Sequence, residues 1–572
     1  MKNDKSKITK LKKILYSIFI GRTSARKLLM FYVYAILLGI IFLSLPISLV
    51  KPGFAIDSSG TERSYNFLDS LFISISAFTD TGLANVNVLG TYNIFGQFVI
   101  VVLIQVGGLG LFTLYWMGWN IIFNSFIYKK IRKIPLSENQ SMGFSRVLMI
   151  DSERGNSKLG LSGQTIKVSL IFIFTSELIF AIIYIFMFAF IPSYAQVDVT
   201  TLTSTSLPNL KPDQLNQIAT LQSGIWYVDT GVTNPFYHNA GLSIWTGIFQ
   251  SISTMNNAGF DIVGASSYGS FRNGVWTIFL YISTIQIIIG GIGYPVIYDL
   301  INYFKYRYHC EKFRFSLFTK VTTITYFLVF IFGLVLLVGF EYGLKKDGIV
   351  YHMNSNETLQ LLYFGTTKSD NNTLYNWNLF SSLFYNVVAS RSNGAATISQ
   401  GTISYVSRWV INILMFIGCS PSSTGGGVRT TSLAIIFMTV ASYMRGFNET
   451  KIFKKTIPNR TVVRSSMIIL FSAIAIFLFA FISYPLALNL DPSNSITITD
   501  IIFEFSSAYG TVGLSSGLSA LLFKNDVNAY LIMILLSIIM IIGQLGTSTV
   551  FTMFRSKSTS RVLSYPYEDI KI

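Results

Sequence analysis

Four apolar segments of this chain are too short to cross a lipid bilayer, and each stops at a polar break that contains a glycine. The first lies in the sequence SISAFTDTGLANVN at residues 74–87, where the tetrapeptide TDTG ends a helix expected at 66–78. The other short helices are expected at 242–255, 377–389 and 498–509. Short helices are tolerated at membrane depth only where their backbone is buried in protein or lines water. Four of them predict an aqueous path enclosed by protein.

Long apolar segments flank each short helix and indicate an integral membrane protein. Charged residues make up 12% of the 572 residues, against about 25% in soluble domains. A helix of about 20 apolar residues spans a bilayer. Such helices are expected at about 29–50, 93–127, 166–192, 273–304, 317–341, 404–444, 463–488 and 528–554. The expected fold is therefore an all-α polytopic membrane protein with eight spans.

The segments recur in one order, with a long helix, a short helix, a polar break and another long helix. This order predicts four pseudo-symmetric helix–pore-loop–helix units around one central pore. The units are expected at 29–127, 166–304, 317–444 and 463–555. They are joined by loops at 128–165, 305–316 and 445–462, and flanked by a basic N-terminus at 1–28 and a tail at 556–572.

The positive charge of the chain predicts its orientation. The net charge is +17, and 32 of the 43 Lys and Arg residues fall in the segments 1–28, 128–167, 305–320, 445–464 and 555–572, which cover the two ends and the loops between units. Positive residues gather on the cytoplasmic side of membrane proteins. We therefore expect a multi-pass protein of the cell membrane, with both termini cytoplasmic and its basic loops near anionic lipid. No basic segment is long enough for a soluble nucleic-acid-binding domain.

Motifs of soluble and membrane enzymes are missing from the sequence. It contains no HExxH, Walker A or GxSxG pattern, and no set of paired carboxylates, which argues against an enzyme. A secondary carrier is an alternative, because carriers also contain repeated units. Carriers place charged or substrate-shaped groups at the midplane, whereas glycines occupy the centre of each unit here, which favours a pore.

The glycines of the four breaks predict a cation filter. A pore that strips water from a cation replaces it with backbone carbonyl oxygens, and glycine adopts the required dihedral angles at low cost. We expect K⁺ to bind at the carbonyls of the filter glycines. The candidate filter residues are Thr81, Gly82, Ala258, Gly259, Asn393, Gly394, Val512 and Gly513. Asp80 and Asp261 are expected at the outer mouth, where carboxylates would concentrate cations.

A triple glycine interrupts the second long helix of unit three. The run STGGGV at 423–428 lies near the middle of the segment 404–444. Each glycine costs a helix about 1 kcal/mol relative to alanine, so the helix is expected to unwind below Gly394. This predicts an intramembrane loop under the filter. The alternative is a simple kink that eases helix packing.

Several of these runs resemble the Trk/Ktr/HKT superfamily of potassium transporters. NNAGF at 256–260 and TVGLS at 511–515 are similar to the family's second and fourth filter sequences. VGGLG at 106–110 and IIGGIGYPVIYDL at 288–300 resemble the second helices of units one and two, and GCSPSSTGGGVRTTS at 418–432 resembles the interruption in unit three. The resemblance extends over about 29–555, and the short N-terminal segment makes the chain most like the Ktr-type membrane subunit.

The resemblance implies a channel-like potassium uptake subunit, with sodium stimulation and no cofactor of its own. It implies a homodimer, and a cytosolic RCK-type regulatory ring that would supply any response to ATP, ADP or NAD. Glycine at all four filter positions favours K⁺, with a less selective Na⁺/K⁺ transporter as the alternative. The implied gating residues are Thr424, Gly425, Gly426, Gly427, Arg429 and Gln544.

The chain departs from the family pattern at two places. Relatives usually carry an arginine in a run like GRLGPLT, where this chain reads GQLGTST at 543–549 and places Gln544. Without that positive charge, we expect a leakier or differently gated pore. Relatives usually read TAGF in the third filter, where this chain has SNGA at 392–395. Because Ala395 removes an aromatic side chain behind the loop, we expect a less rigid third filter.

Overall fold

The computed structural model describes residues 24–110, 163–191, 236–343, 349–355, 372–491 and 496–547 apart from short internal gaps, together with strands β3 (Ala219–Gln222) and β4 (Ile225–Val228). Its three sheets are two-stranded antiparallel hairpins: β3–β4, β1 (Phe54–Ile56) with β2 (Glu62–Ser64), and β5 (Thr450–Ile452) with β6 (Lys455–Ile457). Most of the predicted N-terminus 1–28 and loop 128–165, and the whole tail 556–572, lie outside the described residues.

Each of the four units contains a first helix, a short helix and a second helix. The first helices are α2 (Ser24–Ser44), α10 (Gly163–Phe190), α15 (Leu317–Gly343) and α21 (Asn459–Leu490). The short helices are α3 (Phe67–Phe78), α12 (Ala240–Met255), α18 (Asn372–Ala389) and α22 (Ile498–Gly510). The second helices are α5 (Ile94–Leu109), α13 (Thr277–Ile292), α19 (Tyr405–Phe416) and α24 (Val527–Leu545). Minor helices are α4 (Val88–Thr91), α16 (Ile349–Ser355) and α23 (Leu518–Leu521).

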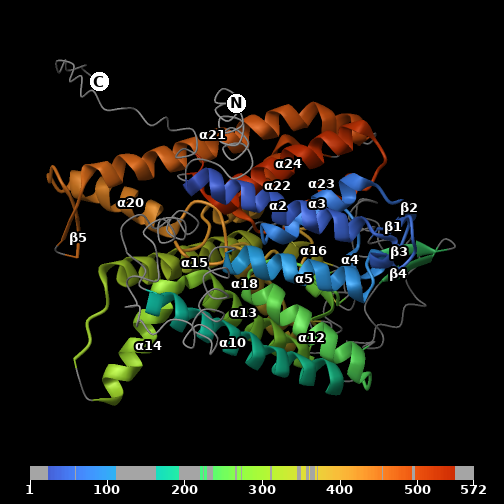
Figure 1. Cartoon of the computed structure of the whole chain (residues 1–572), viewed down its shortest axis with the longest axis horizontal. Coiled ribbons are helices and arrows are strands. Elements are labelled where there is room, and N and C mark those ends of the chain that lie inside the picture. Colours follow the sequence, from blue (N-terminus) through green and yellow to red (C-terminus); the bar gives the residue numbers. More distant parts are fainter. Residues whose placement is uncertain are drawn as a thin grey trace, which may run out of the picture.

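The four units close into a ring. The second helix of each unit packs against the short helix of the next, in the pairs α5–α12, α13–α18, α19–α22 and α24–α3. The last pair joins the end of the chain to its beginning, and Figure 1 shows the red and blue helices side by side. This helical, pseudo-fourfold arrangement confirms the predicted fold class.

The span lengths correct the sequence analysis in two respects. Among the described residues, α10, α15, α21 and α24 are long and apolar enough to cross a membrane. The continuous helix expected at 273–304 is wrong, because α13 meets α14 (Tyr294–Tyr308) at an angle of 105°. The helix expected at 528–554 ends at Leu545.

Glycines in a left-handed conformation cause these breaks. Gly110 after α5, Gly293 after α13 and Gly546 after α24 have φ values of 83°, 95° and 75°. Their ψ values are extended, which turns the chain out of the helix. Glycine takes this conformation at little cost. The signal was in the sequence, since GGLG, GGIG and GQLG end at these three residues.

A buried ion pair fixes the N-terminal end of α3. Asp69 is fully buried and accepts hydrogen bonds from both terminal nitrogens of Arg63, at 2.6 and 2.9 Å. It also accepts from the backbone N–H of Asn66 and the side-chain amide of Asn85, at 2.8 and 2.6 Å. Asp69 therefore joins the helix cap to the hairpin before it and the loop after it.

We expect Asp69→Asn to destabilise the protein by about 3–5 kcal/mol, because the Arg63 guanidinium would stay buried without its counter-charge. Unfolding by heat or denaturant in detergent measures the change. Glu62→Gln is the matched control, since its partner Lys51 and Glu62 itself are 55% and 39% exposed. Such a pair is worth about 0–1 kcal/mol. Equal losses for the two variants would contradict the prediction.

Candidate ion pathway

The glycines of the four breaks lie in one closed ring at the ends of the short helices. All four are left-handed, with φ values of 80°, 72°, 71° and 99° for Gly82, Gly259, Gly394 and Gly513. A Cβ added to each would lie within 2.5 Å of the carbonyl oxygen that precedes the glycine of the neighbouring loop. The four carbonyls belong to Ala258, Asn393, Val512 and Thr81, in chain order around the ring. The structure therefore brings together all eight candidate filter residues.

The second helices approach the ring through further glycines. A Cβ added to Gly107 would lie 1.9 Å from the carbonyl oxygen of Phe78, the last residue of α3. Gly290 and Gly543 hold the same positions against Met255 and Tyr509. Larger side chains would push the carbonyl ends of the short helices away. The breaks in α5, α13 and α24 thus lie immediately beside the ring.

The third glycine loop differs from the others in its backbone. The N–H groups of Thr81, Ala258 and Val512 each donate to the carbonyl five residues earlier, at 2.8–2.9 Å. In the third loop, Asn393 and Gly394 both donate to the carbonyl of Ala389, at 2.9 and 3.0 Å. The loop with the unusual sequence is therefore also the one with shifted hydrogen bonding.

An aromatic cluster surrounds the alanine of that loop. Ala395 is 2% exposed and belongs to a buried cluster with Tyr268 and Tyr385, whose ring centroids are 5.6 Å apart. Tyr268 donates its backbone N–H to the carbonyl of Ala396 at 3.1 Å. Rings from unit two and α18 thus occupy the space behind the loop. The predicted loss of rigidity stays a prediction.

The interruption in unit three is a buried loop, residues 417–429, between α19 and α20 (Thr430–Met444). Every residue from 418 to 428 is buried. The N–H groups of Ser420 and Thr424 donate to the carbonyls of Gly291 and Gly290, at 3.2 and 3.4 Å. The loop therefore packs against the C-terminal end of α13 in unit two. It is thirteen residues long, whereas the alternative prediction was a simple kink.

Side chains on the face of the glycine ring nearest loop 417–429, which we call the base of the ring, form hydrogen bonds to this loop. Asn257 donates its Nδ2–H to Thr424 Oγ1 at 3.0 Å, and Thr511 Oγ1 accepts from the N–H of Gly426 at 2.7 Å. The Cys419 thiol lies 3.0 Å from Ser392 Oγ. Asn257, Ser392 and Thr511 each precede a ring glycine by two residues. Sequence reasoning missed all three, although this constant offset was visible.

Asp80 has the same offset from Gly82. It was predicted at the outer mouth, and the structure places it on the side of the ring that faces loop 417–429. Its side chain is fully buried, and Oδ2 accepts a hydrogen bond from Gln544 Nε2 at 3.3 Å. The short helix points its C-terminal end toward loop 417–429, so the residues just after the helix lie at the base of the ring. Asp261, which follows Gly259, accepts from Ser267 Oγ at 2.7 Å. Its place at the mouth stays a prediction.

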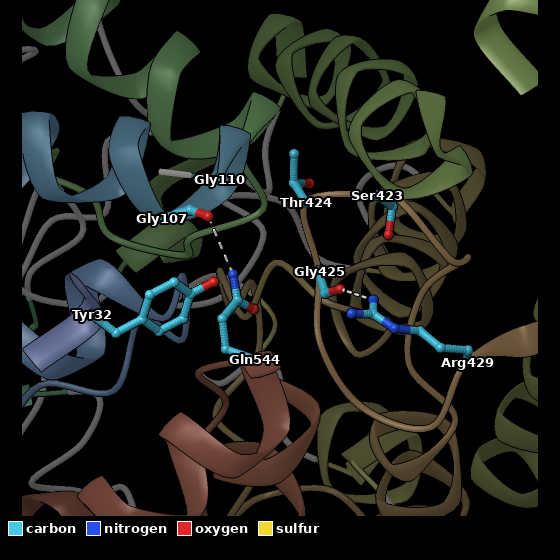
Figure 2. A pocket seen from close by; sticks show the side chains of 8 residues that line it. All are labelled: Tyr32, Gly107, Gly110, Ser423, Thr424, Gly425, Arg429 and Gln544. Carbon is cyan, nitrogen blue, oxygen red and sulfur yellow. Dashed lines mark hydrogen bonds between the residues drawn. The ribbon is translucent and has the colours of Figure 1, made fainter. Parts of the chain in front are cut away.

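Gln544 lines a small pocket between the ring and loop 417–429, together with Thr424, Gly425 and Arg429 (Figure 2). Its Nε2 also lies 3.4 Å from the carbonyl oxygen of Gly107. Arg429 donates from Nη1 to the carbonyl of Gly425. The structure thus places five of the six predicted gating residues on one loop and Gln544 beside it, while their role in gating stays a prediction.

Arg391 is a further buried cation near the loop. It is 1% exposed, donates from Nη2 to the Gly418 carbonyl at 3.0 Å, and lies 5.0 Å from the ring centroid of Tyr326. No group of three or more metal-ligating side chains occurs among the described residues. Backbone carbonyls and isolated polar side chains are what this region offers to an ion.

Comparison with known proteins agrees with this geometry. A family model described as TrkH, cation transport protein, matches residues 48–563. The chain belongs to this family. Its expected resemblance to the Trk/Ktr superfamily is thereby confirmed, and with it the interpretation as a cation transport protein of a membrane.

Relatives of this TrkH family member cover nearly its full length. An uncharacterized cation transporter of Mycoplasma genitalium is 35% identical over 96% of this chain and 98% of its own. Ktr system potassium uptake protein D of Bacillus subtilis is 27% identical over 96% and 97%. The crystal structure of the potassium transporter TrkH from Vibrio parahaemolyticus matches with a TM-score of 0.54 and 15% identity, over 93% of this chain and 86% of that one. This structure supports the shared fold.

Proposed function

We propose that this chain takes up K⁺ across the cell membrane through a channel-like pore whose selectivity filter is the glycine ring. The observation that carries the proposal is the closure of four left-handed glycines onto four neighbouring carbonyls. Carbonyl oxygens of this kind replace the water shell of K⁺. The partial negative charge at the C-terminal end of each short helix adds to the attraction for a cation.

Loop 417–429 is the proposed gate. It is buried at the base of the ring and bonded to two glycine loops through Asn257 and Thr511. Exposed basic residues support a cytoplasmic position for this side of the protein: Lys305 and Arg307 end α14, and Lys451 and Lys455 lie on the β5–β6 hairpin after α20. Positive residues favour that side.

The partners follow from the resemblance to the Ktr type. We propose a homodimer whose basic cytoplasmic surface binds an RCK-type ring, with nucleotide sensing confined to that ring. Potassium-dependent growth of an uptake-deficient bacterium that expresses the chain tests the transport function.

A less selective Na⁺/K⁺ transporter is the second candidate, and the third glycine loop favours it. Its shifted hydrogen bonds at Asn393 and Gly394 make one quarter of the ring unlike the rest. Selectivity depends on the number and arrangement of coordinating carbonyls. Competition between Na⁺ and Rb⁺ uptake in liposomes distinguishes the two candidates.

We expect Gln544→Arg to reduce basal Rb⁺ flux in liposomes by about tenfold, because a fixed positive charge below the ring raises the barrier for a cation. Gln544→Met is the control, since it removes the amide without adding charge. Flux and regulation that are the same in the Arg and Met variants would contradict the proposed leakiness of the natural pore.

A further inference from the structure

We propose that Asp80 and Gln544 form a binding site for a monovalent cation in the pocket between the glycine ring and loop 417–429. The inference rests on the proposed transport function, because it requires the ring to admit cations to this pocket. It assigns to the two residues a second ion position, separate from the carbonyls of the ring.

Asp80 supplies the charge of the site. Asp80 is one of four residues that precede a ring glycine by two positions. The other three, Asn257, Ser392 and Thr511, are neutral. Asp80 has a φ of 51° and no measurable exposure, so its carboxylate is held at the base of the ring. A buried carboxylate attracts cations strongly because little water screens it.

Gln544 supplies a neutral oxygen ligand whose orientation is dictated by its neighbours. Both hydrogen-bond partners of its amide, Asp80 Oδ2 and the Gly107 carbonyl, are acceptors, so the –NH₂ group must face them. Oε1 therefore turns toward the pocket (Figure 2). The residue is 93% buried, and Oε1 receives no hydrogen bond from the described residues. Buried acceptors of this kind require a partner.

A second amide oxygen shows the same lack of a donor. Asn257 donates its Nδ2–H to Thr424 Oγ1, while the Thr424 hydroxyl donates to the Gly290 carbonyl. Oδ1 of Asn257 is fully buried and receives no hydrogen bond within the described part of the chain. The base of the ring therefore presents the Asp80 carboxylate, which accepts from Gln544, and two amide oxygens that receive no hydrogen bond from the described residues.

The charge balance selects a monovalent ion. Ca²⁺ sites use six to eight oxygens, commonly with several carboxylates, whereas no carboxylate lines this pocket and Asp80 adjoins it through its hydrogen bond from Gln544. Arg429 lines the opposite side and is tied to the Gly425 carbonyl. Its positive charge lowers the affinity of the site for a cation, but its side chain does not occupy the site. An ion in transit must bind weakly enough to leave, and the opposed charges of Asp80 and Arg429 meet that requirement.

Density maps of the full chain in lipid nanodiscs test the site directly. Maps in RbCl and in N-methylglucamine chloride are compared, and we expect Rb⁺ density both in the glycine ring and beside Gln544 Oε1. Asp80→Asn should remove the second density and keep the first. Ring density without density beside Gln544, or density that persists in Asp80→Asn, would overturn the inference and leave the proposed function intact. Absence of Rb⁺ from both positions would overturn both.

Ion flux from the two sides of a liposome gives an independent measurement. We expect Asp80→Asn to raise the Rb⁺ concentration for half-maximal flux from the loop 417–429 side by about tenfold, the lower end of the gain in local concentration that a charged cleft provides. Arg429→Gln should lower it. Glu62→Gln, which removes an exposed carboxylate from the β1–β2 hairpin, is the control and should change neither side. An Asp80→Asn value equal to this control contradicts the site.

Discussion

Gly513→Asp should abolish potassium-dependent growth of an uptake-deficient bacterium that expresses this protein. Gly513 has a φ of 99°, and its added Cβ would lie 2.3 Å from the carbonyl oxygen of Thr81 and 3.1 Å from the Cα of Gly82. The aspartate would push apart the first and fourth loops and place a carboxylate in the ring. Growth at limiting K⁺, with surface expression measured in parallel, gives the result.

A second pair of variants separates the ring contact from backbone strain. Gly513→Ala and Gly53→Ala both place a Cβ on a left-handed residue, since Gly53 has a φ of 83°. The shared strain is about 1–2 kcal/mol. No atom lies within 4 Å of a Cβ at Gly53, whereas the one at Gly513 meets Thr81. We expect Gly53→Ala to support growth and Gly513→Ala to fail.

Growth that survives Gly513→Asp would show that the ring is not the filter. Failure of both alanine variants would instead point to a general folding defect. The contrast is informative because a carbonyl ring tolerates little displacement, so that a shift of one loop changes the distance from every oxygen to the ion.

The ring could be predicted from the sequence because it depends on local backbone preference. A helix too short to span, followed by a glycine, recurs four times at Gly82, Gly259, Gly394 and Gly513. In a membrane, this pattern indicates short helices grouped around an aqueous path enclosed by protein, because unpaired backbone must face protein or water. The contact of each glycine with the carbonyl of the neighbouring loop comes from the structure alone.

The direction of the chain at each break was harder to predict. Asp80 was expected at the mouth because a carboxylate there would concentrate cations, yet it precedes Gly82 and lies just after the end of α3, beside Gln544. Residues that come two positions before a ring glycine lie next to the end of the short helix, on the side of the ring that faces loop 417–429. Applied to Asn257 and Thr511, the same logic would have predicted their contacts with loop 417–429.

The breaks in the second helices depended on packing that a single segment does not reveal. Gly290 and Gly543 read as ordinary helix-packing glycines in the sequence. In the structure they admit the carbonyl ends of α12 and α22, and the following Gly293 and Gly546 redirect the chain. Only the interruption at 423–428 carried enough consecutive glycine to predict a break from helix propensity alone.

Thr511→Val should raise the flux of the resting protein. Valine keeps the shape of threonine but removes the oxygen that accepts the Gly426 N–H at 2.7 Å. An unsatisfied buried donor costs about 1–3 kcal/mol, which would favour displacement of loop 417–429 by about 5–150-fold. Rb⁺ uptake into liposomes without any regulatory partner measures the increase.

Thr511→Ser is the matched control, because serine retains the hydroxyl oxygen at the same place and loses a methyl group. We expect it to behave like the natural protein. Thr175→Val tests the substitution itself, since Thr175 lies on the exposed face of α10 and, among the described residues, bonds only within its own helix, to Ile171 and Phe172. A flux in Thr511→Val that matches both controls would mean that this bond does not hold the loop closed. Higher flux in Thr511→Val alone would link the base of the fourth glycine loop to the gate.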